Sequence, residues 1–434
     1  MERVSTTTAA SGPDVIVHEV VEPPLSTRSR LTAAGLLVLV GLVCALVFGL
    51  HASGTASFSL SASPKITVDV PARAACLVLG VVVLLLGGWH AVRGWRRAAM
   101  RWVLSAALVC FVASFLCWAV TGQPGTSFDL LGLLQSSVLT AVPLVLGALA
   151  GVMCERSGVI NVAIEGQMLA GAFAGALVGS VAGNGYVGLV GGVLAGALMG
   201  LLLALFAIRY LVNQVVLGVV LNGFALGLTG FLYDALMQPN ADALNNPTIF
   251  DPIKLPLLSD IPVLGPLLFE ANIIVYLTYV LIVVVDVALF RTRWGLRTRA
   301  IGEHPRAADT VGIRVLAMRY RNVVLGGAVA GLAGAYLTLG SVGAFGKNMT
   351  SGKGFIALAA VIFGRWSPRG AIAAALLFGF TTSVATVLSF TKTPVTIPTN
   401  FLVMLPYLAT VFAVAGLVGR VQAPAADGEP YVKG

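Results

Sequence analysis

Long apolar stretches are the feature that most limits what this chain can fold into. A helix needs roughly 20 apolar residues to cross a bilayer, where every backbone polar group must be bonded within the protein. Stretches of about this length lie at 31–50, 74–92, 101–120, 130–153, 159–183, 186–208, 215–233, 271–290, 322–345, 370–390 and 400–419. A shorter one, 354–364, suits a half-span or re-entrant helix. The sequence therefore predicts an all-α, polytopic transmembrane helical bundle of about twelve segments, including broken or re-entrant helices.

The composition supports a membrane as the solvent. Hydrophobic residues make up 58% of the chain and charged residues only 10%, which leaves too little polar surface to coat a soluble globule. Glycines recur every four residues at 171–179 and 188–200, a spacing that lets helix backbones pack closely in lipid. The net charge of +9 comes from basic residues in short loops without interleaved aromatic residues, so nucleic acid is not an expected partner.

The distribution of arginine predicts the orientation. Four arginines between residues 93 and 101 mark one short loop, and eight mark the loop 291–321. An even number of spans separates these loops, so we expect both in the cytoplasm together with both chain ends. The segment 234–270 then lies outside, and its five acidic residues and six prolines suit a structured external excursion.

Several polar residues stand at the entry to the apolar stretch 159–183. Asn161 and Glu165 are four apart and would share a helix face, with Gln167 on a different one. An ionisable group inside a membrane is a functional-site hypothesis, so we predict that these residues line the substrate path. The equal alternative for Glu165 is a structural ion pair at a helix end. Asn222, in a later span, is a further candidate for bonding either a polar solute or a neighbouring helix.

The sequence carries no pattern typical of catalysis or of a bound metal or cofactor. It has no Gly-x-x-x-x-Gly-Lys-Ser/Thr run, so we expect no ATPase site of its own. The five cysteines lack metal-ligand spacing, and the four histidines lie in the tail, in loops or at span ends, so no catalytic triad is expected at membrane depth. We therefore expect a transport protein and not an enzyme.

Three segments carry a resemblance to a known family. They are Glu155–Met168 with the sequence ERSGVINVAIEGQM, Ala300–Ala308 leading to Gly312 and Ile313, and Gly352–Trp366. In this order they resemble the permeases of bacterial nucleoside and simple-sugar ABC importers, where Asn-Ile-Gly-x-Glu-Gly is usual and this chain has Val162 and Ala163 instead of Ile and Gly. The resemblance covers roughly residues 130 to 420 and is strongest to the nucleoside-type branch.

The basic loop 291–321 contains a helix-compatible run, Pro305–Val311, opened by a proline suited to a first helical turn. By itself this run suits either topology-setting charge or docking onto a soluble motor. The resemblance implies docking onto a separate cytoplasmic ABC ATPase subunit, through the coupling positions Gly302, Glu303, Ala307, Ala308 and Gly312. The arginines would also suit anionic membrane lipid.

The resemblance further implies a second permease chain, related but different, an extracytoplasmic solute-binding protein, and a bacterial plasma membrane location. The implied solutes are nucleosides first and simple sugars next, with branched-chain amino acids as a neighbouring alternative. Two rivals from other classes remain: a secondary transporter driven by an ion gradient, with Glu165 as the proton or cation site, and a membrane scaffold or receptor.

Four parts are expected along the chain. A disordered cytoplasmic tail occupies 1–30, an N-terminal extension with three transmembrane helices occupies 31–129, the permease core occupies 130–420, and a cytoplasmic tail occupies 421–434.

Overall fold

The structure is a computed structural model that describes residues 27–60, 66–95, 97–121, 127–391, 398–407 and 422–433. Most of the expected N-terminal tail and most of the apolar stretch 400–419 lie outside these residues.

Ten helices in the described part of the chain are long and apolar enough to cross a membrane, which confirms a polytopic helical bundle. Several of them continue into a π-helical turn, labelled η. The ten are α1 (Thr27–Leu42) with η1 (Val43–Phe48) and α2 (Gly49–His51), α3 (Ala72–Val92), α4 (Arg97–Val120), α5 (Leu130–Glu155), α6 (Ile164–Ala182), α7 (Gly185–Ala204) with η2 (Leu205–Arg209), α8 (Gln214–Leu232) with η3 (Tyr233–Met237), α11 (Ile273–Arg291), α14 (Val315–Ala335) with η4 (Tyr336–Val342), and α16 (Pro368–Phe390). The shorter helices are α9 (Ala241–Leu244), α10 (Leu264–Leu268), α12 (Arg293–Glu303), α13 (Pro305–Thr310), α15 (Lys353–Phe363) and α17 (Thr399–Val403).

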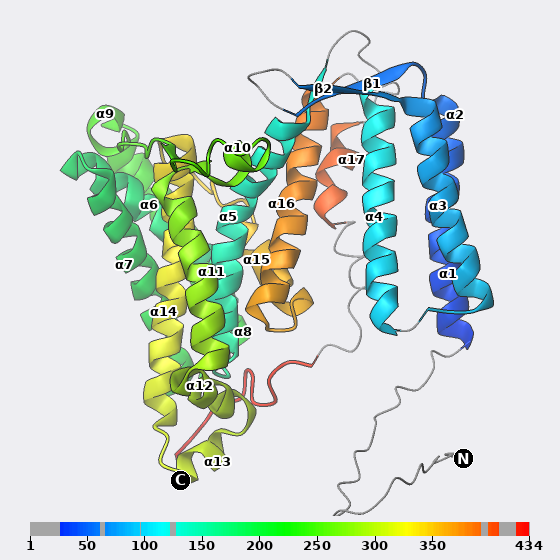
Figure 1. Ribbon diagram of the computed structural model, residues 1–434. Coiled ribbons are helices and arrows are strands. Elements are labelled where there is room, and N and C mark those ends of the chain that lie inside the picture. Colours follow the sequence, from blue (N-terminus) through cyan, green and yellow to red (C-terminus); the bar gives the residue numbers. More distant parts are fainter. Residues whose placement is uncertain are drawn as a thin grey trace, which may run out of the picture.

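The centre of the bundle is built from α5, α6 and α14, which α7, α15 and α16 cover (Figure 1). Glycine makes the closest approaches possible. Gly331 of α14 faces Gly171 of α6 and Gly196 of α7, and a Cβ on any of the three would collide with the opposite backbone. Such contacts gain dispersion energy where lipid offers no hydrophobic drive between helices.

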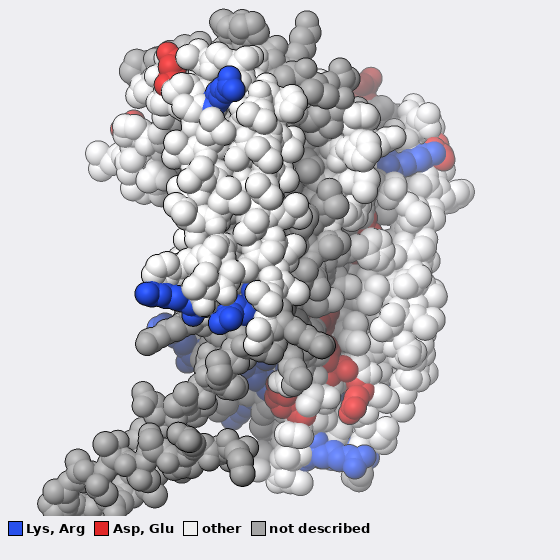
Figure 2. All heavy atoms as spheres, turned by 90° about the vertical axis from the view of Figure 1, so that its right-hand side faces the viewer, with Lys and Arg blue, Asp and Glu red and all other residues white. Residues whose placement is uncertain are grey.

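The loops separate into two groups at opposite ends of the bundle. Figure 1 places α12, α13, the turn between α3 and α4 and the C-terminal end of the chain at one end, and α9, α10 and the strands at the other. The two arginine-rich loops therefore share one end, and the segment 234–270 lies at the opposite one. On the side that carries α1 and α3, a broad face without charged side chains separates the charges near the two ends (Figure 2).

Short strands fasten the N-terminal helices to the rest of the bundle. A sheet of order β2-β1-β3 joins β2 (Thr67–Pro71), β1 (Thr55–Ser59) and β3 (Phe128–Asp129), directly before α5. Beneath the sheet, a cluster of apolar side chains joins Phe48 and Trp118 of the extension to Leu388 of α16. A second pair, β4 (Ile253–Lys254) and β5 (Glu270–Ala271), joins two parts of the chain between α9 and α11. Hydropathy gives no signal for strands this short.

Helical structure stops at two places in the core of the bundle, between α5 and α6 and before α15. The stretch predicted as helix from 159 becomes helical only at Ile164, because residues 156–163 form a turn in which Gly158 has φ +84°. Asn161 lies in this turn, so the prediction that it shares a helix face with Glu165 is wrong. The second interruption precedes α15, where residues 343–352 form an irregular loop.

Candidate translocation site and coupling segment

The N-terminal ends of α6 and α15 meet at Glu165. The side chain leaves the first turn of α6 and reaches the start of α15, where its Oε1 and Oε2 accept hydrogen bonds from the backbone N–H groups of Gly352 (2.8 Å) and Gly354 (2.6 Å). These N–H groups have no partner within a helix, and a carboxylate there also interacts favourably with the helix dipole. Glu165 is buried, so the contact fastens the short helix to the bundle.

Gly354 permits this contact, because a Cβ at that position would collide with the backbone of Glu165. Beside it, Lys353 Nζ lies 3.3 Å from the carbonyl oxygen of Thr350 and 3.5 Å from that of Met349. The loop 343–352 leads directly into the short apolar helix α15, and short helices that begin at an irregular loop build solute sites in transporters.

Asn161 and Gln167 are fully buried and bonded to each other. The Asn161 Nδ2 group donates to Gln167 Oε1 at 3.0 Å and lies 3.5 Å from the Cys154 sulfur. The remaining amide atoms, Asn161 Oδ1 and Gln167 Nε2, have no hydrogen-bond partner. An unpaired buried polar group costs about 1–3 kcal/mol. The pair can therefore offer one acceptor and one donor to a polar solute or to water.

Asn222 of α8 holds the start of α6 in place. Its Oδ1 accepts from the backbone N–H of Gly166 at 2.7 Å, and its Nδ2 donates to the carbonyl oxygen of Val162 at 2.9 Å. Gln214, at the start of α8, accepts from the backbone N–H of Ile160 at 2.7 Å. The four predicted path residues thus lie around one interruption. Asn222 bonds across it, Asn161 pairs with Gln167, and Glu165 reaches away to α15.

An aromatic cluster covers the site on the side of α9. Phe345 of the loop 343–352 is buried between Phe173 of α6 (ring centroids 5.3 Å apart) and Tyr233 of η3 (5.9 Å). Asn245 clamps the Phe345 backbone, accepting from its N–H at 2.7 Å and donating to its carbonyl at 3.0 Å. An ion pair between Lys347 and Asp234 joins the same two segments at the surface.

A charged cluster covers the opposite side of the site. The Trp366 indole N–H donates to the buried carboxylate of Glu155, and Arg156 Nε donates to the Trp366 carbonyl at 2.7 Å. Arg319 of α14 is also buried, and its Nε donates to the Ser157 carbonyl at 3.1 Å. These contacts tie α14 and the corner after α15 to the turn that precedes α6.

Four of the predicted coupling positions lie on α12 and α13, and Gly312 follows α13. Gly302 packs against the Arg156 backbone so closely that a Cβ would collide with its carbonyl oxygen. Glu303 is exposed, 4.0 Å from the Arg156 guanidinium. Ala308 is buried, whereas Ala307 is exposed on the other face of α13. Gly312, with φ +82°, provides the left-handed turn after α13. The candidate coupling segment, 302–312, therefore touches the candidate site through the turn 156–163.

The residues 422–433, here named the C-terminal strap, were not predicted as part of the site. The strap runs along α12, where the Ala426 N–H donates to the Gly302 carbonyl at 2.9 Å and the Ala425 N–H donates to Glu303 at 3.1 Å. Tyr431 is buried in the apolar cluster that contains Ala308. The sequence signal is weak, because the strap is short and its partners are distant along the chain.

The strap also brings an acid into the charged cluster. Asp427 faces Glu155, Arg319 and Arg156, and Arg319 Nη1 donates to the Glu429 carbonyl at 2.9 Å. Burial raises the pKa of Asp427 to about 7, although the charge of Arg319 acts in the opposite direction. The docked strap therefore favours a protonated Asp427.

The geometry offers polar contacts within a membrane bundle, and among the described residues no cluster of three or more His, Cys, Asp or Glu could hold a metal ion. Comparison with known proteins adds a family. The profile of the family described as "Branched-chain amino acid transport system / permease component" matches residues 133–418. No solved structure matches the chain.

Characterised relatives match over most of their own length. The guanosine ABC transporter permease protein NupQ of Bacillus subtilis is 41% identical over 312 residues, which is 70% of this chain and 97% of that protein. The nucleoside ABC transporter permease protein NupC of Lactococcus lactis subsp. cremoris is 37% identical over 69% of this chain and 96% of that protein. The putative glucose ABC transporter permease protein TsgC13 of Haloferax volcanii is 37% identical over 57% of this chain and 75% of that protein.

Proposed function

The chain belongs to the permease family of branched-chain amino acid transport systems, and from that premise we propose that it forms the translocation path of an ABC importer for nucleosides. The observation that carries the choice of solute is its 41% identity to a guanosine permease over 97% of that protein. Simple sugars are the second candidate, because the putative glucose permease matches over a smaller share of both chains.

The polar groups around the interruption before α6 suit such a solute. A nucleoside carries hydroxyl and ring groups that need donors and acceptors once they leave water. Asn161 Oδ1 and Gln167 Nε2 supply one of each inside the bundle. We propose that the aromatic cluster around Phe345 closes the path toward the outside and the charged cluster around Arg319 closes it toward the cytoplasm, so that access alternates.

The energy for transport comes, in this proposal, from a separate ATPase subunit that docks on α12 and α13 in the cytoplasm. Movement there reaches the path through Gly302 and the turn 156–163. The segment 234–270, at the opposite end, is the proposed contact for a solute-binding protein, and a second permease chain completes the transporter. Under this orientation both chain ends lie in the cytoplasm.

The first experiment is to purify the tagged chain from its native membrane in mild detergent and to measure ATPase activity. We expect an ATPase subunit to co-purify and its turnover to rise with guanosine more than with glucose or leucine. Uptake of labelled guanosine in cells should survive an ionophore that collapses ion gradients. If the chain purifies without an ATPase in several detergents, and the ionophore abolishes guanosine uptake, the chain is instead a secondary transporter.

The solute-path assignment has a separate test. Asn161→Ala and Gln167→Ala should raise the KM for guanosine uptake at normal expression, because each removes a group offered to the solute. Asn213→Ala is the matched control, since that side chain only caps α8 at an exposed position. Unchanged uptake kinetics in the two path variants would remove these residues from the path.

A further inference from the structure

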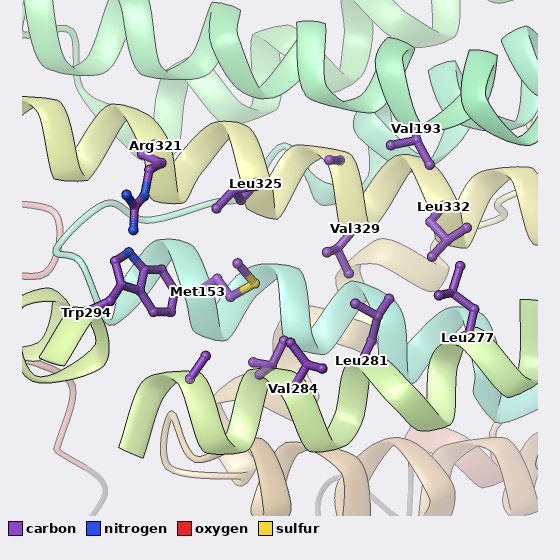
Figure 3. A pocket seen from close by; sticks show the side chains of 13 residues that line it. Met153, Val193, Leu277, Leu281, Val284, Trp294, Arg321, Leu325, Val329 and Leu332 are labelled. Carbon is purple, nitrogen blue, oxygen red and sulfur yellow. The ribbon is translucent and has the colours of Figure 1, made fainter. Parts of the chain in front are cut away.

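An apolar groove with a volume of about 510 Å³ opens between α11 and α14 (Figure 3). Its walls carry aliphatic side chains of both helices, such as Leu281 and Leu325, and Met153 of α5 lies at its floor. Only two of its lining residues carry polar side-chain groups, Arg321 and Trp294, and both lie at one end. The groove is therefore amphipathic along its length.

The polar end holds unsatisfied hydrogen-bonding capacity. The Arg321 guanidinium lies 5.5 Å from the Trp294 ring centroid, and Figure 3 shows the two groups pointing toward each other. Arg321 is exposed and has no ion-pair partner within the described ranges. The Trp294 Nε1 atom is buried and has no acceptor. The Arg321 guanidinium and the Trp294 N–H could therefore both bind an anionic acceptor.

The depth of the groove matches one leaflet of a bilayer. Helix α11 ends at Arg291 and Trp294 follows in the first turn of α12, at the level where a span leaves the membrane and where Trp and Arg are favoured. From Arg321 to Leu332 the groove follows α14 for about 16 Å, close to half of the roughly 30 Å hydrocarbon core.

We propose that this groove binds one acyl chain of an anionic phospholipid, with the phosphate at Arg321 and Trp294. The methylene groups of an acyl chain would fill the space between α11 and α14 and gain dispersion contacts with its aliphatic walls. The Arg321 guanidinium can pair with the phosphate through two parallel hydrogen bonds. A nucleoside does not suit the groove, because its hydroxyl groups would meet aliphatic walls. A helix of a second permease chain would also cover the aliphatic walls, and crosslinking from Leu325 distinguishes it from a lipid.

The test is native mass spectrometry of the purified chain with equal amounts of phosphatidylglycerol and phosphatidylcholine. We expect one retained phosphatidylglycerol, because phosphatidylcholine carries a choline cation that offsets its phosphate charge beside Arg321. The expected preference is about fivefold, the factor that a contact of about 1 kcal/mol gives. Arg321→Gln should abolish the preference, whereas Arg297→Gln, an exposed arginine of α12 outside the groove, should keep it. Ala328→Phe fills the groove and should lose the lipid, whereas Ala373→Phe on the exposed face of α16 should retain it.

Equal retention of the two lipids, or equal behaviour of Ala328→Phe and Ala373→Phe, would overturn the proposal. A photoreactive residue placed at Leu325 distinguishes a lipid in the groove from a helix of another permease chain. Coupling to lipid supports the proposal, and coupling to another permease chain rejects it. All of these readouts report what occupies the groove, so their result does not depend on which solute is carried.

Discussion

At the scale of single residues, Glu165 joins two segments that are distant in sequence. Its carboxylate uses both oxygens on the backbone N–H groups at the start of α15, and no arginine is bonded to it among the described residues. The alternative of a structural ion pair therefore takes a different form here. The partner of the acid is the N-terminus of α15, where the unpaired N–H groups and the helix dipole give a partial positive charge.

Glu165→Gln should destabilise the chain, because the Gln amide keeps one acceptor oxygen but turns an NH₂ donor toward a backbone donor. We expect a loss of about 1–3 kcal/mol, the cost of unpaired buried groups, measured as a lower apparent Tm in detergent. Glu270→Gln, which breaks only the surface pair with Lys254, is the control and should change little. A variant as stable as this control but inactive in uptake would instead assign Glu165 to the solute.

Asp427 makes docking of the C-terminal strap dependent on pH. Its pKa rises from 3.8 to about 7 through burial, so the docked state binds a proton that the free strap releases. Docking is strongest below pH 4 and weakens as the pH rises through 7. Hydrogen exchange at the Ala425 and Ala426 amides, corrected for its intrinsic pH dependence, should lose protection by up to about tenfold per pH unit between these limits.

Asp427→Asn should remove this dependence, because the amide cannot ionise. Asp242→Asn, an exposed acid on α9, should leave it in place. If protection follows pH equally in both variants, another group controls docking.

At the scale of elements, α13 presents two different faces. Ala308 packs inward with Val315 and Tyr431, whereas Ala307 and Val311 are exposed. The two alanines were predicted together as coupling positions, yet only Ala307 is free to touch a partner subunit. The buried face instead connects α13 to the C-terminal strap.

Ala307→Glu should therefore abolish co-purification of the ATPase while the chain still inserts and folds, because it adds bulk and charge to the proposed docking face. Ala308→Glu should disturb folding first, since a carboxylate would enter an apolar cluster; we expect a cost of several kcal/mol and exposure of the strap to protease. Ala243→Glu at the opposite end is the control. Undisturbed ATPase association in Ala307→Glu would remove α13 from the interface.

The elements that the sequence could predict are those that hydropathy controls. The long spans follow from transfer of apolar side chains into lipid, which is a local property. The interruption at 156–163 is not local in this sense. The sequence separates two spans near this point, but the turn extends to residue 163 because Asn222 and Gln214 of α8 hold its backbone. A short apolar run between glycines was enough to predict α15.

The sequence could nominate candidate residues for the site but not the bonds between them. Polar residues inside a span indicate a site, because lipid makes them costly. Their partners depend on tertiary contacts, so the bond from Asn161 to Gln167 and the strap around Arg319 could not be inferred from spacing.

At the scale of the whole molecule, the N-terminal extension is joined to the core by side chains that lipid could replace. The family profile begins at residue 133, after the three helices of the extension. The shared apolar cluster contributes Leu133, Val384 and Leu388 from the core, and the sheet adds only the two residues of β3. Apolar side chains lose little when lipid covers them instead of another helix.

A chain lacking residues 1–126 should therefore insert, keep its ATPase partner and lose no more than a few degrees in apparent Tm. The physical reason is that its newly exposed surface near Leu388 is apolar and faces the bilayer. Deletion of the C-terminal strap from Gln422 is the contrast. It exposes the buried guanidinium of Arg319 and leaves Gly302 without its strand-like partner, so ATPase-coupled uptake should fall although fewer residues are removed. Aggregation of the first variant, with the second intact and active, would show that the extension holds the core together and that 130–420 is not an independent domain.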